Sequence, residues 1–131
     1  MDAPEVLYYT IDQLKKLTSE ELAHEEFRVN QYILYLREKI NRQKMFFKWF
    51  ESKSDELTSQ IVQDTDPSLG WNARLLKARH SHPLAEFINK GIRSSSSIIN
   101  DNENTTYDII RIADCLKDLR FVAIAREKHG H

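Results

Sequence analysis

The stretch that decides the fold covers residues 18–64 and reads TSEELAHEEFRVNQYILYLREKINRQKMFFKWFESKSDELTSQIVQD. It holds no proline and no glycine, so no residue in it obliges a helix to end. Thr18 stands three residues before Glu21 in an acidic first turn, a spacing typical of a helix-capping box. Pro67 and Gly70 follow and favour a helix end. The sequence therefore predicts one long helix over this stretch.

Apolar residues in this stretch recur with a period close to seven. Two sets of positions, each spaced by seven, form a seam, and nine of its twelve positions are apolar. The three polar positions are Glu26, Gln43 and Ser54, and a polar residue such as Gln43 can fix the register of a helix pair. The apolar members, which we expect to mediate self-association, are Leu22, Val29, Ile33, Leu36, Ile40, Phe47, Phe50, Leu57 and Ile61.

The predicted length of this helix decides whether it can fit inside a compact single chain. A helix of about 46 residues spans about 69 Å at about 1.5 Å per residue. A compact domain of this size is only about 36 Å across. Either the helix breaks near residues 52–55, or it projects and pairs with another chain. Because most of the seam continues past residue 55, we expect an unbroken helix and a homo-oligomer, with a dimer favoured.

The remaining residues indicate shorter helices. Residues 1–17 form a short N-terminal segment with one helix from Ile11 to Leu17, capped by Thr10. Residues 65–104 hold a short helix within Leu69–His82, another from Pro83 to Lys90 closed by Gly91, and a polar loop. The loop, residues 92–106, reads IRSSSSIINDNENTT. A last helix, residues 105–128, has Thr105 as its cap.

The composition fits a single all-α domain over residues 1–131. The chain is 40% hydrophobic, with 3 Gly and 3 Pro, which is too apolar for disorder and too poor in turn-forming residues for a many-stranded β fold. We expect a helical bundle in which shorter C-terminal helices pack on the long coiled-coil-like helix. No apolar run reaches 18 residues, and the acidic N-terminus lacks the apolar core of a secretory signal, so we expect no membrane partner. The single cysteine indicates no oxidising compartment, which leaves the cytoplasm or the nucleus.

An aromatic flank lies beside the seam. The segment KMFFKWF, residues 44–50, holds more apolar surface than one stripe can bury. On a helix, Phe46 and Trp49 point to one side of the seam, and Tyr35 lies on the same flank. The flank could pack on the chain's own C-terminal helices or bind a partner protein. Because lysines bracket the aromatics, stacking with bases or a ligand is a further alternative.

A basic cluster follows in residues 71–93, with five Lys and Arg against one Glu. Its cations are Arg74, Lys77, Arg79, Lys90 and Arg93, and Trp71 lies beside them in the sequence. The cluster could be a solvated helix face, or it could contact an acidic protein surface or the phosphates of a nucleic acid. No helix-turn-helix, zinc-finger or RNA-binding signature supports the nucleic acid.

Catalytic and metal-binding signatures are missing from the sequence. His80 and His82 are two residues apart and would point away from each other on a helix, and no set of three or four zinc ligands occurs. Cys115 flanks the apolar stripe of the last helix and is expected to be a small buried residue. The serines of 94–97 could be phosphorylated if the loop is exposed, although a solubilising linker is the simpler interpretation. We expect no enzyme, no metal and no cofactor.

These observations predict a non-catalytic assembly or adaptor domain. The long helix would self-associate through the seam, and a protein partner would bind elsewhere on the chain. The alternative is a nucleic-acid-associated accessory factor that uses the basic patch at residues 71–93, with Trp71 as a stacking platform.

Overall fold

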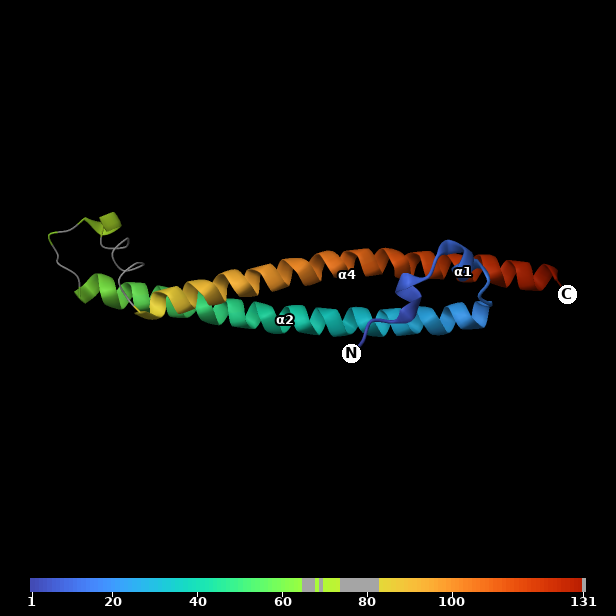
Figure 1. The fold of residues 1–131 in the computed structure, drawn as a ribbon, viewed down its shortest axis with the longest axis horizontal. Coiled ribbons are helices and arrows are strands. Elements are labelled where there is room, and N and C mark those ends of the chain that lie inside the picture. The colour runs from blue at the N-terminus through green and yellow to red at the C-terminus, as the bar shows by residue number, and fades with distance from the viewer. Residues whose placement is uncertain (65–67, 69, 74–82, 131) are drawn as a thin grey trace. The chain divides into compact units, whose positions relative to one another are not determined.

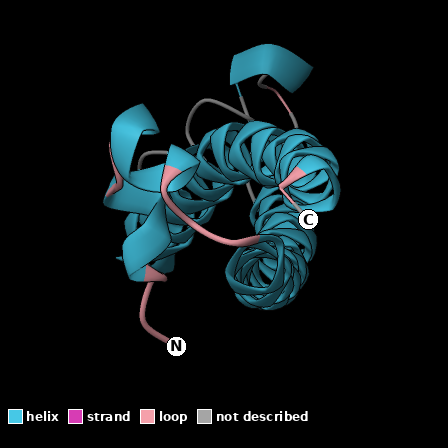
Figure 2. Cartoon of the chain, turned by 90° about the vertical axis from the view of Figure 1, so that its right-hand side faces the viewer, coloured by secondary structure: helices cyan, strands magenta, loops and turns pink. Residues whose placement is uncertain are grey.

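The computed structural model describes residues 1–64, 68, 70–73 and 83–130, apart from the side chains of Ile61, Val62, Asp64 and Pro83. Its elements are the 3-10 helix η1 (Glu5–Tyr8) and the α-helices α1 (Ile11–Lys15), α2 (Ser19–Asp64) and α4 (Pro83–His129). Figure 2 shows helices and loops, and no strand, in the described part of the chain. The prediction of an all-α helical bundle is confirmed, with α2 packed against α4.

Helix α2 begins at the predicted capping box. The Thr18 backbone N–H donates to Oε1 of Glu21 over 3.0 Å, and the Glu21 N–H donates to Oγ1 of Thr18 over 3.1 Å. These two reciprocal bonds satisfy backbone N–H groups that have no partner in the first turn. The helix continues without interruption through residues 52–55, where a break was the alternative.

Helix α4 differs from the prediction over its first half. The polar segment 92–106, predicted as a loop, lies inside one continuous helix (Figure 1), and Thr105 caps no helix. Two of its polar residues are buried: Ser95 is 4% exposed and Thr106 is 6% exposed. Oγ1 of Thr106 donates to the carbonyl oxygen of Asn102 over 2.7 Å, so its hydroxyl is satisfied within the helix. Most of the other polar side chains of the segment are exposed, as on the outer face of a helix, and the loop prediction was wrong.

Gly91, predicted to close a short helix, instead lies in the interior of α4. A Cβ atom at this position would lie 2.5 Å from Cε1 and Cζ of the Phe50 ring. Real Cβ atoms do not come so near a neighbouring atom, so any larger residue would have to displace the ring. The absence of a side chain therefore lets Phe50 of α2 pack directly on the backbone of α4.

The chain divides into two compact units. Unit 1 comprises residues 1–39 and 102–131, and unit 2 comprises residues 40–101. In unit 1, α2 and α4 are antiparallel, because Ser19 contacts Glu127 and Glu26 contacts Arg120. The core of this unit consists of Val6, Leu14, Leu22, Val29, Ile33, Leu36, Ile109, Ala113, Leu116 and Ala123.

The N-terminal elements of unit 1 pack on this core. Val6 of η1 is 2% exposed and Leu14 of α1 is 7% exposed. Thr10 caps α1 through a capping box with Gln13, which confirms the predicted cap, although α1 ends at Lys15 and not at Leu17. The guanidinium of Arg126 in α4 donates to the carbonyl oxygens of Lys15 and Leu17, so α1 is tied to α4 after its last turn.

In unit 2, α2 and α4 are also antiparallel neighbours. Residues of α2 meet residues of α4 in reverse order: Phe47 lies near Asn100, and Leu57 lies near Leu84. Ile40, Ala85 and Ile88 supply the buried apolar side chains that the structure describes in this unit, each at most 7% exposed. Most of the larger apolar side chains of unit 2 are only partly covered.

Candidate functional site: an exposed aromatic face on unit 2

The seam residues expected to join two copies are covered within the chain. In unit 1, the four seam residues are at most 5% exposed and share the core with apolar residues of α4: Leu22, Val29, Ile33 and Leu36. In unit 2, Ile40 is buried, Phe47, Phe50 and Leu57 are half-buried, and the side chain of Ile61 lies outside the described residues. Pairing of two copies through this seam would therefore first require α2 to separate from α4.

Two polar residues of α2 in unit 1, Glu26 of the seam and Ser19, pair with side chains of α4. Nε of Arg120 lies 2.8 Å from Oε2 of Glu26, and both side chains are largely shielded, at 28% and 19% exposed. The carboxylate of Glu127 accepts the Ser19 N–H over 2.9 Å and the Ser19 hydroxyl over 2.6 Å. This negative charge at the N-terminus of α2 also interacts favourably with the helix dipole. Glu26, one of the three polar positions of the seam, is thus an interhelical partner.

The predicted aromatic flank is divided between the two units. Tyr35 packs against the core of unit 1 and stacks on Tyr32, with 5.9 Å between the ring centroids. Burial, and then the neighbouring Tyr35, Tyr8 and Asp2, raise the pKa of Tyr32 above its ordinary value. Phe46 and Trp49 belong to unit 2 and are 55% and 52% exposed. Tyr35 therefore has a core role, and only the other two flank residues are available at the surface.

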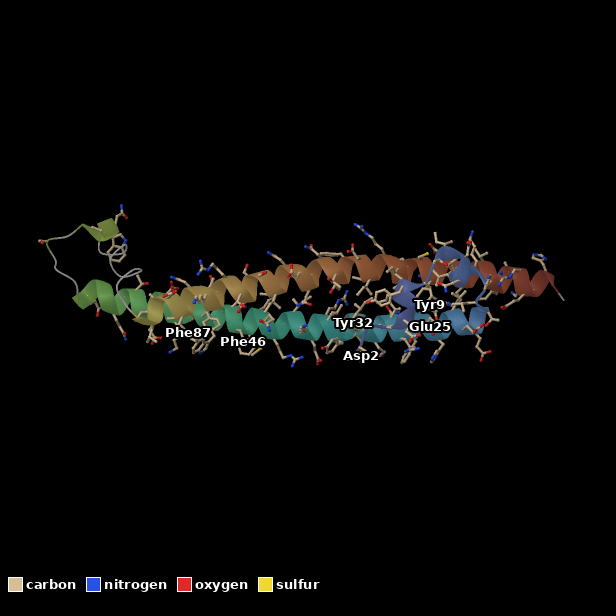
Figure 3. All side chains as sticks on the ribbon, viewed as in Figure 1. Asp2, Tyr9, Glu25, Tyr32, Phe46 and Phe87 are labelled. Atoms are coloured by element: carbon tan, nitrogen blue, oxygen red, sulfur yellow. The ribbon has the colours of Figure 1, made fainter. Side chains whose placement is uncertain are left out.

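Helix α4 also exposes two large apolar side chains in unit 2. Leu84 is 55% exposed and Phe87 is 62% exposed. The Phe50 ring connects the helices, with its centroid 5.2 Å from that of Trp49 and 6.1 Å from that of Phe87, both in edge-to-face geometry. Figure 3 shows the side chains of Phe46 and Phe87 on the same side of α2 and α4. We call Phe46, Trp49, Leu84 and Phe87 the aromatic face.

Three residues of the aromatic face, Trp49, Leu84 and Phe87, line a groove. It has a volume of about 320 Å³ and lies between α2 and α4, and its apolar lining comes from Trp49, Leu57, Leu84, Phe87 and Ile88. Lys53, Glu56 and Gln60 supply its polar lining. Nζ of Lys53 lies 5.8 Å from the Trp49 ring centroid and 3.1 Å from Oε2 of Glu56. Sequence reasoning missed Leu84 and Phe87, although their i, i+3 spacing directly after Pro83 was an available signal.

The described part of the basic cluster does not form one site. Trp71 is 63% exposed, and Arg74, Lys77 and Arg79 lie outside the described residues. Nζ of Lys90 lies 3.6 Å from Oε1 of Glu86. Arg93 lines a different, open hollow of about 540 Å³ beside Phe47 and Ile92. A phosphate-binding site formed by the whole basic cluster stays a prediction.

Other chemical groups give no further candidate in the described residues. No group of three His, Cys, Asp or Glu residues there could hold a metal ion. Cys115 is exposed, so the expectation of a buried thiol was wrong. The serines 94–97 lie in α4, where the exposed loop expected for phosphorylation does not form. No helix among the described residues is long and apolar enough to cross a membrane.

Comparisons with known proteins give no relative from which a function could be transferred. No protein-family model matches the chain, and no curated protein or solved structure matches it.

Proposed function

We propose that the chain is a non-catalytic helical module that binds a partner protein through the aromatic face of unit 2. The observation that carries the proposal is the exposure of four large apolar side chains, each more than half exposed. Three of them, Trp49, Leu84 and Phe87, line one groove. Fully burying a large apolar side chain contributes about 1.5–3 kcal/mol, so covering the exposed half of each of the four would contribute about half of that. Aromatic residues in a shallow pocket are also the usual hot spots of protein interfaces.

The interhelical seam has a different role in this proposal. We infer that α2 and α4 pair in a coiled-coil-like manner within one chain, since the buried positions on both helices follow a spacing of seven. The apolar area that would drive a homodimer through α2 is then already removed from water. The proposed partner is a different protein. A single cysteine, Cys115, fits the cytoplasm or nucleus as the compartment.

The nucleic-acid alternative has weaker support. Of its footprint, Lys90 pairs with Glu86 and Arg93 lies beside Phe47, while Trp71 is exposed. A steep fall in affinity for DNA or RNA with rising salt, abolished by Arg74→Ala with Lys77→Ala, would support it.

A comparison of bait variants tests the proposed function. The full chain, a Phe46→Ser/Phe87→Ser variant and a Phe27→Ser control are used to isolate proteins from a native extract. Phe27 is 61% exposed in unit 1, so the control removes an equally exposed aromatic residue far from the face in sequence. We expect a protein that the full chain and the control retain equally and that the double variant retains at least about tenfold less.

Two results would contradict the proposed function. If all three baits retain the same proteins in the same amounts, or if nuclease treatment releases the bound material, the aromatic face is not a protein-binding surface. Circular dichroism of each bait shows whether its helix content is unchanged, which separates loss of binding from loss of fold.

A further inference from the structure

The core of unit 1 is built from the N-terminal segment as well as from the two long helices. Helices α2 and α4 contribute Leu22, Val29 and Leu116, each at most 1% exposed. The N-terminal segment adds Val6 and Leu14 to the same core. The free energy that holds a fold together grows with the apolar area removed from water, so separating the helices of unit 1 is costly.

The core of unit 2 is thinner in the residues that the structure describes. Its buried apolar side chains are Ile40, Ala85 and Ile88, and they come from α2 and α4 alone. One of the three is an alanine, which buries little apolar area. A further buried position is occupied by the polar Ser95, and the aromatic side chains of α2 in this unit are half-buried or exposed. Separating the helices of unit 2 therefore costs less than separating those of unit 1.

The sequence of α4 also favours unwinding in unit 2. Residues 83–101 of this helix contain Gly91 and the four serines of 94–97. Gly and Ser have lower helix propensities than Ala, Leu or Lys. Such a segment stays helical mainly because its buried face packs on a neighbour, which is the usual source of helix stability in proteins. It loses that support once α2 and α4 separate in this unit.

We propose that unit 2 opens independently: its two helices separate and unwind while unit 1 stays folded. Proteins commonly open in contiguous units of different stability, and the two compact units of this chain are such units. The open state uncovers Phe47 and Phe50, which are half-buried in the closed state. Opening thus controls how much apolar surface unit 2 presents. The inference holds whether or not the aromatic face binds a partner protein.

Native-state hydrogen exchange of the full chain, followed by NMR for each backbone amide, tests this proposal. Amides 44–49 and 96–101 of unit 2 are compared with amides 24–29 and 118–123 of unit 1. In both helices the chosen amides of unit 2 lie farther from the nearest helix end, so fraying alone would make them the better protected. We expect the opposite: protection factors at least about tenfold lower in unit 2 than in unit 1.

Two matched substitutions separate independent opening from cooperative unfolding of the whole chain. Ile33→Val and Ile88→Val each remove one methyl group, the first from the core of unit 1 and the second from that of unit 2. Because unit 1 is folded in the open state, Ile33→Val should lower protection about fivefold in unit 1 and leave it unchanged in unit 2. Ile88→Val destabilises the closed state alone, so it should lower protection about fivefold in both units.

Three results would overturn the proposal: equal protection in the two units, lower protection in unit 1, or an equal loss of protection in both units on Ile33→Val. Circular dichroism shows whether each variant keeps its helix content. The comparison within the unaltered chain decides the matter even if a variant fails to fold.

Discussion

At the residue scale, Gly91 is the position in unit 2 where the missing side chain makes room for the Phe50 ring, since a Cβ there would lie 2.5 Å from that ring. Overpacking typically costs about 1–3 kcal/mol. Ala in place of Gly inside a helix returns about 1 kcal/mol through helix propensity. We therefore expect Gly91→Ala to lower the free energy of unfolding by about 1 kcal/mol, measured by urea denaturation.

Two controls belong with this substitution. Gly70→Ala places a Cβ where no atom lies within 4 Å, and it should leave the free energy of unfolding nearly unchanged. In a Phe50→Leu background, Gly91→Ala should become neutral or stabilising because the ring is gone. A Gly91→Ala variant that is more stable than the original chain would show that the Phe50 ring does not pack at this position.

Tyr32 makes the stability of the folded chain depend on pH in the alkaline range. Burial raises its pKa first, and Tyr35, Tyr8 and Asp2 add to the rise, so the folded state favours the neutral phenol. The stabilisation from this phenol is complete below the ordinary pKa of 10.0 and is lost as the pH rises through the higher folded-state pKa. We expect Tyr32→Phe to reduce the loss of stability above pH 10.0, measured by urea unfolding at several alkaline pH values. An identical loss in both proteins would contradict this assignment.

At the scale of the helices, the Glu26–Arg120 pair connects α2 to α4 in unit 1 over 2.8 Å. Hydrogen bonds that involve charged groups contribute about 1.5–3 kcal/mol, and removing one partner leaves the other shielded from water and unpaired. We expect Glu26→Ala to lower the free energy of unfolding by about 2 kcal/mol. Glu56→Ala removes the more exposed pair with Lys53 and should cost less than about 1 kcal/mol.

A double-mutant cycle isolates this contact. Arg120→Ala is combined with Glu26→Ala, and the coupling energy is obtained from urea denaturation of all four proteins. A coupling near zero would mean that the two side chains do not interact and that the register of the two helices is set by the apolar core alone.

The two long helices differ in how far the sequence predicts them. Helix α2 could be predicted because nine of its twelve seam positions are apolar and Thr18 marks its start. The first half of α4 could not be predicted in the same way, because Ser95, Asn102 and Thr106 occupy positions that elsewhere on the helix are apolar. Steps of seven backward from Leu116 reach Ile109, Asn102, Ser95 and Ile88, all buried or half-buried, and this spacing was the available signal.

Two of the four residues of the aromatic face could be predicted from the sequence. Phe46 and Trp49 are apolar residues off the seam of α2, so their exposure follows from helix periodicity alone. Leu84 and Phe87 join them only because α2 and α4 pair in one particular register, which depends on contacts between residues far apart in the sequence. The assignment of Tyr35 failed for the same reason, since core packing in unit 1 covers that position.

At the scale of the whole molecule, the oligomeric state depends on which helix covers the seam of α2. In both units that partner is α4 of the same chain. Pairing within one chain is favoured by a high effective concentration, which a second molecule can match only at high protein concentration. The aromatic face of unit 2 then stays exposed, and it is the surface proposed to bind a different protein.

Cross-linking tests this pairing most directly. Glu26→Cys and Arg120→Cys are introduced with Cys115→Ser, which removes the only natural cysteine, and the protein is treated with a short bismaleimide at several concentrations. The account predicts a cross-linked product that keeps the mass of one chain, 15.5 kDa, at every concentration. A covalent dimer as the main product, with sedimentation equilibrium of the untreated chain at twice that mass, would contradict it.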